Sequence, residues 1–518
     1  MPPMPRTPRK LRAPRISRPA HRPPLLCMLA ALCLAGCAAV GPDFQPETPA
    51  APPDFGTWHG GAAELAVPAD PAPGAPLDWA MFGDPVLEQL QARALQANAD
   101  LQTAALRFAQ SRAQRRIVDS LQAPQVGLQA SVTEVRASEY GDFTRVLDAL
   151  NAPNKDEVVQ VLSDPYGLYQ AGFDAVWEID VWGRVRRSIE AADANVAAAQ
   201  ALLAQARLSV QAEVARSYFE LRGVQRQIEL TRADLQAADE TLQLMKARAA
   251  GGLTTDLDVV RQAALTADLR SRLPSLLAQE ARTLNVLSLL LGERPGSLAQ
   301  TLAAPAARAQ ALPDLSLGLP SEMALRRPDI QRAQAQLHTA TAEVGVAVAD
   351  LYPRITLGAS FGFVSAGAGN FGEWGSRQWS IGPNLQLPVF DQGRRKATIT
   401  LRKLQQQEAA VSYQQTVLKA WHEIDDALSA YNAERARNLQ LAAKERDSRD
   451  ALALARARYD AGMTDFLVAL DAERTLLQAR REFADSSARL ALSLVAVSKA
   501  LAASPPPTAP PLPIAGAG

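Results

Sequence analysis

The sequence predicts an α+β membrane protein in which a few short strands join a shared β-barrel and very long helices extend from that barrel. Three observations lead to this fold class. Four segments alternate between apolar and polar residues, two predicted helices cover 184–249 and 394–459, and the same order of elements occurs twice along the chain. A helix of that length reaches roughly 100 Å, which suits a coiled coil or a helical tube better than a globular domain.

The N-terminus has the pattern of a bacterial lipoprotein signal peptide, predicted over residues 1–36. Residues 1–37 contain basic but no acidic side chains, and they end in an apolar run, LLCMLAALCLAGC. A run of about twelve apolar residues is too short to span a bilayer but suits a signal peptide. The last four residues, 34–37, resemble a lipobox, in which the thiol of Cys37 is acylated. An ordinary secretory signal with a chance cysteine is the alternative. Ala38 after the cysteine resembles lipoproteins sorted to the outer membrane.

The charge and cysteine content limit the classes of function and the means of stabilisation that are open to the chain. The formal charge of the whole chain is zero, with 54 basic and 54 acidic residues, so removal of the basic N-terminus leaves a mildly acidic protein. An acidic remainder gives no indication of nucleic-acid binding, which favours a basic surface. All three cysteines, Cys27, Cys33 and Cys37, lie in the N-terminal segment. We therefore expect no disulfides, and stability must come from the core and from assembly.

The chain contains an internal two-fold repeat. At an offset of 210 residues Gly252 aligns with Gly462 and Thr254 with Thr464, and upstream the offset becomes 229. The change in offset predicts an insertion of 19 residues between Pro124 and Gly172 of the first copy. The predicted regions are a lipidated extended segment (37–83), a first repeat (84–292), a connector (293–325), a second repeat (326–503) and a disordered tail (504–518). Each repeat is predicted to run helix, strand, strand, long helix, Gly-containing turn and helix, with first helices at 84–121 and from 326.

The four strands are predicted at 125–135, 169–180, 354–363 and 379–390. Along each, residues such as Val, Leu, Phe and Trp alternate with Gln, Gly, Ser and Thr. This pattern is typical of transmembrane β-barrel strands, although a soluble sheet with one wet face also fits. The smallest membrane barrels have about eight strands, and open sheet edges are not tolerated in lipid. Several chains must therefore share one barrel if these strands span a membrane. Trp177, Trp379 and Tyr169 are candidates for aromatic girdles at the membrane surfaces.

Several motifs resemble one known family. They are VGPDF (40–44), WAMFGDPVLEQLQARALQANADL (79–101), FDAVWEIDVWGRVRR (173–187), LPSEMALRRPDIQRAQAQL (319–337) and ARYDAGMTDFLVALDAERTLL (457–477). The chain resembles the TolC-like outer-membrane factors, also called outer membrane efflux proteins, in their OprM/NodT-type lipoprotein branch. The resemblance covers about residues 34–503 and departs from the family in its long presequence and in the residues after Leu501.

The resemblance implies a trimeric 12-stranded β-barrel, with four strands per chain, continued by a long periplasmic α-helical barrel. It further implies an outer-membrane channel of a tripartite efflux system, working with a periplasmic adaptor and an inner-membrane pump, of resistance-nodulation-division type. Such channels export drugs and other small molecules, so antibiotic resistance is an expected consequence. No cofactor is expected apart from the covalent lipid, including palmitate, on Cys37, and the protein is expected in the outer membrane of a Gram-negative bacterium.

Two Gly-containing breaks are predicted to be helix–helix turns at the periplasmic tip. Gly252 and Gly462 can adopt the left-handed conformation, and Thr254 and Thr464, or Asp256 and Asp465, can cap the returning helices. By resemblance to the family, Asp258, Tyr459, Leu467 and Asp471 line or latch the closed end of the channel. In a trimer each aspartate forms a ring of like charges, which favours cations. Ordinary turn chemistry and solvated helix carboxylates are the alternatives.

Enzyme chemistry is not expected. GASFG (358–362) matches a nucleophile-elbow motif, but that motif needs a strand-to-helix turn, whereas Ser360 lies within a predicted strand. The four histidines, His21, His59, His338 and His422, share no metal-binding spacing. Two alternatives to drug efflux are a channel for type I polypeptide secretion or heavy-metal efflux, and a structural periplasmic lipoprotein without a pore.

Overall fold

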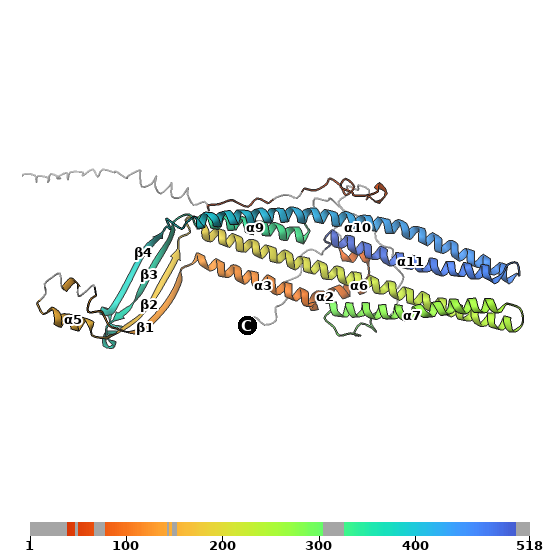
Figure 1. The fold of residues 1–518 in the computed structure, drawn as a ribbon, viewed down its shortest axis with the longest axis horizontal. Helices are drawn as coiled ribbons and strands as arrows, with labels where there is room; N and C mark the ends of the chain where they lie inside the picture. Colours follow the sequence, from red (N-terminus) through yellow and green to blue (C-terminus); the bar gives the residue numbers. More distant parts are fainter. Residues whose placement is uncertain are drawn as a thin grey trace, which may run out of the picture.

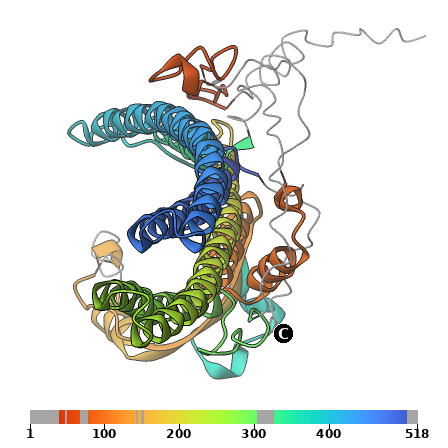
Figure 2. The same ribbon diagram turned by 90° about the vertical axis from the view of Figure 1, so that its right-hand side faces the viewer.

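A computed structural model describes residues 39–46, 50–66, 78–141, 145–147, 153–303 and 326–503. The chain is elongated, with a β-sheet at one end and long helices that extend from it to two turns at the other end (Figure 1). Seen along the long axis, the helices form a curved layer (Figure 2). The predicted signal peptide, Cys37 and the predicted tail lie outside the described residues, as does most of the predicted connector. No described helix is both long and apolar enough to cross a membrane.

The two long helices are predicted almost to the residue. The described helices are α2 (Pro85–Ala97), α3 (Ala99–Asp119), α5 (Lys155–Ser163), α6 (Arg184–Ala250), α7 (Asp256–Leu290), α9 (Pro328–Ala349), α10 (Arg394–Asp460) and α11 (Phe466–Ala500). Both α6 and α10 contain 67 residues, and both α7 and α11 contain 35. The bounds of α6–α7 and α10–α11 thus differ throughout by the 210 residues found in the sequence.

The helix predicted over 84–121 is wrong as one element, because the chain breaks at Asn98. Asn98 has extended backbone angles, its side-chain oxygen accepts from Leu101 N at 3.1 Å, and its amide donates to Leu290 O at 3.0 Å. One side chain therefore caps α3 and fixes the break against α7. The second helix likewise begins at Pro328 rather than at residue 326, since Arg327 is extended and Pro occupies the first helical position.

The sheet is antiparallel and follows the chain order β1 (Gln125–Val135), β2 (Tyr166–Glu178), β3 (Arg354–Ser365) and β4 (Arg377–Gln386). Its register aligns one apolar row across all strands, because Leu128 pairs with Phe173, Phe173 with Phe361 and Phe361 with Trp379. Trp379 remains 66% exposed. The predicted apolar face is therefore continuous and open to the surroundings.

The predicted strand at 379–390 is too long. Gln386 pairs with Arg354, the first residue of β3, so the chain beyond Gln386 has no strand beside it, and Pro388 lacks an N–H. In the register Trp379 is paired through Phe361 with Phe173, midway along β2 between Tyr169 and Trp177, and its place in an aromatic girdle stays a prediction. Helix α5 lies in the predicted insertion between β1 and β2 (Figure 1).

The main core lies where both repeats meet midway along the helices. It contains residues from α2, α6, α7, α9, α10 and α11, with Tyr218, Leu287, Trp421 and Leu494 among them. The Tyr218 hydroxyl donates to Asp84 at 2.6 Å, and burial, followed by this hydrogen bond, raises the pKa of Tyr218 to about 12. The tyrosine therefore stays neutral and links α6 to the N-cap of α2.

Arg327 explains the RRPD motif. It is buried and bonds to both carboxylate oxygens of Asp329, to Glu423 at 2.7 Å and to the carbonyl of Ala500 at 2.7 Å. Burial lowers its pKa, but the two carboxylates outweigh that and raise it. One guanidinium thus ties the start of α9 to α10 and to the end of α11.

The N-terminal residues run along the outside of the helices. Gly41 approaches Gly345 of α9 so closely that a Cβ on Gly41 would lie 2.5 Å from the Gly345 Cα. Phe44 stacks on His338 with ring centroids 4.2 Å apart, and Arg187 of α6 pairs with Asp43. The VGPDF motif is thus a strap docked across α6 and α9.

A second docked segment, residues 50–66, crosses α10. Trp421 Nε1 donates to Ala50 O at 3.1 Å and Asn432 donates to Leu65 O at 2.8 Å. Between them His59 Nδ1 lies 2.7 Å from Asp425 Oδ1, and Gly60 N donates to Asp425 Oδ2 at 3.0 Å. Asp425 therefore holds both the ring and the backbone of the segment.

The attachment of residues 50–66 is expected to weaken as pH rises. The hydrogen bond with Asp425 raises the pKa of His59, so the ion pair is complete below the pKa of a free histidine and is lost as pH passes the raised value. Amide exchange of residues 50–66, corrected for intrinsic rates, should show more protection at about pH 6 than at about pH 8.5. His59→Gln keeps a hydrogen-bond donor at this position but does not titrate, so protection of residues 50–66 in this variant should not depend on pH. Equal protection of the wild-type segment at both pH values contradicts the prediction.

Candidate functional site

The turns opposite the sheet are two matching Schellman motifs. After α6, Leu253 N donates to Arg248 O at 2.8 Å and Gly252 N to Ala249 O at 2.9 Å. After α10, Met463 N donates to Arg458 O and Gly462 N to Tyr459 O, both at 2.9 Å. Gly252 and Gly462 have φ of +73° and +70°, as predicted for left-handed glycines. Leu253 and Met463 follow them and are exposed.

The predicted caps of the returning helices are corrected by the structure. Thr255, which was not predicted, is the N-cap of α7, and its hydroxyl accepts from Asp258 N at 3.3 Å. Asp465 holds the equivalent position before α11 but makes no side-chain cap hydrogen bond. Thr254 precedes the cap and donates to Asp258 instead, and Asp256 already lies inside the helix. The Thr464 hydroxyl is buried and has no hydrogen-bond partner in the described structure.

The four predicted gate residues fall into two groups. The Asp258 carboxylate turns back to its own turn, accepting from the hydroxyls of Thr255 at 2.7 Å and Thr254 at 3.2 Å. Leu467 is 48% exposed, and Asp471 lies exposed one helical turn further along α11. No hydrogen bond or ion pair among the described residues joins Asp258 to Asp471. Leu467 and Asp471 are therefore available at the surface of a single chain, whereas the Asp258 side chain is only 17% exposed and also lies 3.8 Å from Arg261.

Tyr459 is the gate residue that connects the two hairpins. Its hydroxyl lies 3.3 Å from Arg248 Nη1 at the end of α6, and the Arg248 guanidinium lies over the ring at 5.6 Å. The same ring packs on Phe466, with centroids 5.6 Å apart. Arg248 was not predicted; its position in the last turn of a helix gives an ordinary reason for a cation there, so the sequence alone did not single it out.

An apolar cluster lies behind this contact. Met245 and Leu265 from the first hairpin pack with Phe466, Leu470 and neighbouring residues of the second. The two turns are thus held together by buried apolar contacts, with Arg248 and Tyr459 at the rim.

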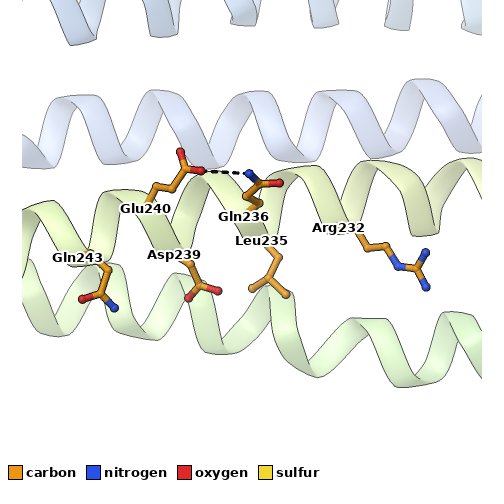
Figure 3. Close-up of a pocket in the computed structure, with 6 residues that line it drawn as sticks. All are labelled: Arg232, Leu235, Gln236, Asp239, Glu240 and Gln243. Atoms are coloured by element: carbon orange, nitrogen blue, oxygen red, sulfur yellow. Dashed lines mark hydrogen bonds between the residues drawn. The ribbon is translucent and has the colours of Figure 1, made fainter.

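A shallow recess of about 450 Å³ opens on α6 between the core and the turns. Figure 3 shows its lining, which is Arg232, Leu235, Gln236, Asp239, Glu240 and Gln243. Gln236 donates to Glu240 at 3.1 Å, and Asp239 pairs with Arg270 of α7. All of these side chains come from one helix and most are exposed, so the recess is an open stretch of helix surface rather than an enclosed substrate cleft.

Two other sequence features are explained by the sheet and the helices. Ser360 lies within β3, as predicted, and its hydroxyl is 2.8 Å from that of Ser380 on β4, so it lacks the turn of a nucleophile elbow. His59 and His338 each pair with a carboxylate. Within the described residues no group of His, Cys, Asp and Glu is arranged to hold a metal ion.

Comparison with known proteins gives a consistent result. The family model described as outer membrane efflux protein matches residues 90–293 and 319–503. The chain is 34% identical over 476 residues to the outer membrane protein OprJ of Pseudomonas aeruginosa, covering 92% of this chain and 94% of OprJ. It is 31% identical over 482 residues to the toluene efflux pump outer membrane protein TtgI of Pseudomonas putida, covering 92% and 97%.

The fold is shared with a solved channel. The structure of the outer-membrane channel OprN matches with a TM-score of 0.77 at 33% identity, over 90% of this chain and 99% of OprN. The match spans the sheet and the helices together.

Gly462→Ala is expected to loosen the tip without affecting the body. No atom lies within 4 Å of the added Cβ, so the cost is the left-handed backbone alone, about 1 kcal/mol or a fivefold change in the local opening equilibrium. Amide exchange at the second turn should therefore quicken about fivefold, while the melting temperature stays the same. Gly251→Ala is the control, because Gly251 has an ordinary φ of −86°. A large fall in melting temperature for Gly462→Ala contradicts the prediction.

Proposed function

The chain belongs to the outer membrane efflux protein family and is the outer-membrane channel component of an efflux system, and we propose that it works as a homotrimer with a continuous β- and α-helical barrel. The observation that carries the proposal is the four-stranded sheet, which has an exposed apolar face and two unpaired edges, β1 and β4. Three copies supply twelve strands and pair every edge, which lipid requires.

The helices have free edges on the same two sides as the sheet. Near the sheet α3 packs on α6, α6 on α9 and α9 on α10; nearer the turns α7 packs on α6, α6 on α11 and α11 on α10. One side of the chain therefore carries β1, α3 and α7, and the other carries β4 and α10. Such unlike edges support a head-to-tail interface, which closes into a ring when the rotation fits.

The α10 edge carries an apolar stripe suited to such an interface. Leu401, Leu404, Val411 and Leu418 lie on one helical face and are 52–63% exposed. Leu106 and Ile117 are exposed on α3, at the other edge. Contact between these residues of neighbouring copies removes both sets from water, which is the favourable term for assembly.

We further propose that the tips of the three chains close the inner end of the channel. Leu467 and Asp471 share an exposed face of α11, and Asp258 and Tyr459 lie beside the same turns. In three copies the aspartates form rings of like charge, which are unfavourable when held close together and favour cations. In this scheme the adaptor opens the tip by separating Tyr459 from Arg248. The exposed side chains of Leu253 and Met463 are the apolar residues on which the adaptor docks.

Acylation of Cys37 is the proposed membrane anchor. The docked strap begins only three residues after this cysteine, where Val40 N donates to Trp182 O between β2 and α6. A lipid on Cys37 therefore enters the membrane beside the base of the sheet.

The proposed partners are a periplasmic adaptor and an inner-membrane pump of resistance-nodulation-division type, and the proposed cargo is drugs or other small molecules. The relatives support this choice, because TtgI is named for toluene efflux. Two alternatives are polypeptide secretion and heavy-metal efflux, in which the channel is the same and the inner-membrane pump differs. A lipoprotein without a pore is the alternative from a different class.

Leu404→Glu combined with Val411→Glu is expected to reduce the trimer fraction at least tenfold, because each change buries an unpaired carboxylate at the interface. Light scattering of the protein in detergent measures the oligomer. Leu244→Glu is the control, since Leu244 is exposed on α6, which has neighbours on both sides. If the double variant still forms trimers, the interface between chains does not include this stripe of α10.

Asp258→Ala combined with Asp471→Ala is expected to raise basal conductance several-fold in planar bilayers and to sensitise cells to bulky drugs. Asp447→Ala removes an exposed carboxylate from α10 away from the turns and should have no effect. If neither wild-type nor variant trimers conduct, and wild-type protein does not restore ethidium efflux to channel-deficient cells, the channel proposal fails.

A further inference from the structure

The two repeats of the chain are joined by a single interface near the sheet. Strand β2 of the first repeat pairs with β3 of the second, and α6 of the first repeat packs on α9 of the second. The opposite sides carry β4 and α10, which belong to the second repeat, and β1 and α3, which belong to the first (Figure 1). Among the described strands and α-helices of one chain nothing equivalent covers these sides.

The strand register shows that the repeat is exact in the sheet. Gln125 of β1 pairs with Val176 of β2. The offsets of 229 and 210 residues carry this pair onto Arg354 and Gln386, which pair between β3 and β4. The two offsets therefore transfer a pair of one repeat onto the matching pair of the other without a shift.

Burial on the two long helices identifies the face of α10 that lacks a neighbour. At the offset of 210 residues the exposed stripe on α10 corresponds to a row on α6, so that Leu401, Leu404, Val411 and Leu418 match Ala191, Ala194, Ala201 and Leu208. The α10 residues are 52–63% exposed, whereas their α6 counterparts are only 3–8% exposed. Helix α10 has α9 beside it as α6 has α3, so the missing neighbour is the counterpart of α9, which is α3 of another copy.

The same offsets, applied to the pairing of β2 with β3, give the contacts between copies. Asp174 pairs with Ser360. Adding 210 to the first number and subtracting 229 from the second gives Asn384 of one copy opposite Ser131 of the next. Both residues lie on the polar face of the sheet, so the apolar face stays continuous across the boundary. A slip of two residues would keep the same faces together, so the repeat selects a register that the apolar pattern alone leaves open.

The segment that follows β4 gains a partner in this register. Just after β2, Ile179 N donates to Ile355 O at 2.9 Å, and the offsets carry this contact onto Val389 and Val126 of the next copy. In the single chain Val389 is 91% exposed and Val126 is 67% exposed, and the pairing of β4 with β3 ends before Val389. The apolar end of β4 thus lacks a strand partner that a second copy supplies.

The two prolines of this region fit the register at the loss of one hydrogen bond. The contact between Ile179 and Ile355 marks a hydrogen-bonded pair, and such pairs alternate along an antiparallel ladder. After transfer, Pro388 takes a position that makes no hydrogen bond to the neighbouring copy. Pro383 lies opposite Val132 at a hydrogen-bonded position, where its missing N–H leaves one gap in the ladder.

We propose that β4 of one copy pairs with β1 of the next in the register that the internal repeat dictates, with Asn384 opposite Ser131 and Val389 opposite Val126. Residues 387–389 then become part of β4 only on assembly. The proposal rests on the homotrimer proposed above and adds the pairs of residues through which neighbouring copies recognise each other.

The test is disulfide cross-linking of the full chain at four positions on the polar face. Ser131→Cys with Asn384→Cys and Thr133→Cys with Gly382→Cys are the matched pairs, and the second is the transfer of Gly172 with Gly362. A Cβ on Gly382 meets no atom within 4 Å. Directly opposed residues of this kind have Cα atoms about 4.5 Å apart, and a shift of two residues moves them to about 7–8 Å, beyond the reach of a disulfide.

The controls exchange the partners, as Ser131→Cys with Gly382→Cys and Thr133→Cys with Asn384→Cys, so the same four positions are compared. Mild copper-catalysed oxidation of outer membranes should give covalent trimers from both matched pairs at least about fivefold faster than from the exchanged pairs, measured on non-reducing denaturing gels. Single-cysteine variants control for the cysteines of the N-terminal segment. Trimers in which an exchanged pair cross-links as fast as the matched pairs would overturn the register.

Amide exchange tests the same pairing should the cysteine variants not assemble. The Val389 amide should exchange at least about tenfold more slowly in the wild-type trimer than in the chain that carries Leu404→Glu and Val411→Glu. Equal exchange in a wild-type trimer and in the variant contradicts the proposal. If light scattering shows that the wild-type chain is not a trimer, the proposed homotrimer fails and this inference fails with it.

Discussion

The constraint on which the structure depends is the requirement that backbone hydrogen bonds be satisfied in a nonpolar environment. A four-stranded sheet with an exposed apolar face leaves the N–H and C=O groups of β1 and β4 unpaired at its edges. Among the described residues of one chain there is no further strand to cover them. The same two sides carry the outermost of the described helices, α3 and α7 on one side and α10 with its apolar stripe on the other. In the proposed trimer, neighbouring copies of the chain would cover both the sheet edges and the helix edges.

Charged residues in the body fix how the elements meet. Arg327 joins the start of α9 to α10 and α11, and Arg187 joins the N-terminal strap to α6. Both belong to sequence motifs that carry the family resemblance. In the structure each arginine binds carboxylates and backbone carbonyls at a junction between elements, which a planar guanidinium does well. The motifs therefore mark the places where the repeats and the strap are fastened together.

Periodicity made most of the fold predictable. Strand β1 and the long helices have nearly the predicted bounds, because alternation and the 210-residue offset report directly on backbone geometry. Apart from the end of β4, which stops at Gln386, the misses concern single side chains. Asn98 breaks a helix whose flanks are both helix-forming, and Thr255, which has extended backbone angles, caps α7 rather than Thr254. The contact of Arg248 with Tyr459 depends on how two hairpins lie together, which neither hairpin's own sequence specifies.

The equal lengths of the hairpins have a consequence for how such a chain can change over time. Helices α6 and α10 have the same number of residues, as do α7 and α11, so the two turns end level with each other. Each added residue lengthens a helix by about 1.5 Å and rotates its far end by about 100°. A single insertion would therefore both stagger the turns and swing one of them out of contact. The helices can therefore change in length only when whole turns are added to all four of them together. The length of the tunnel thus evolves through coordinated changes in both repeats.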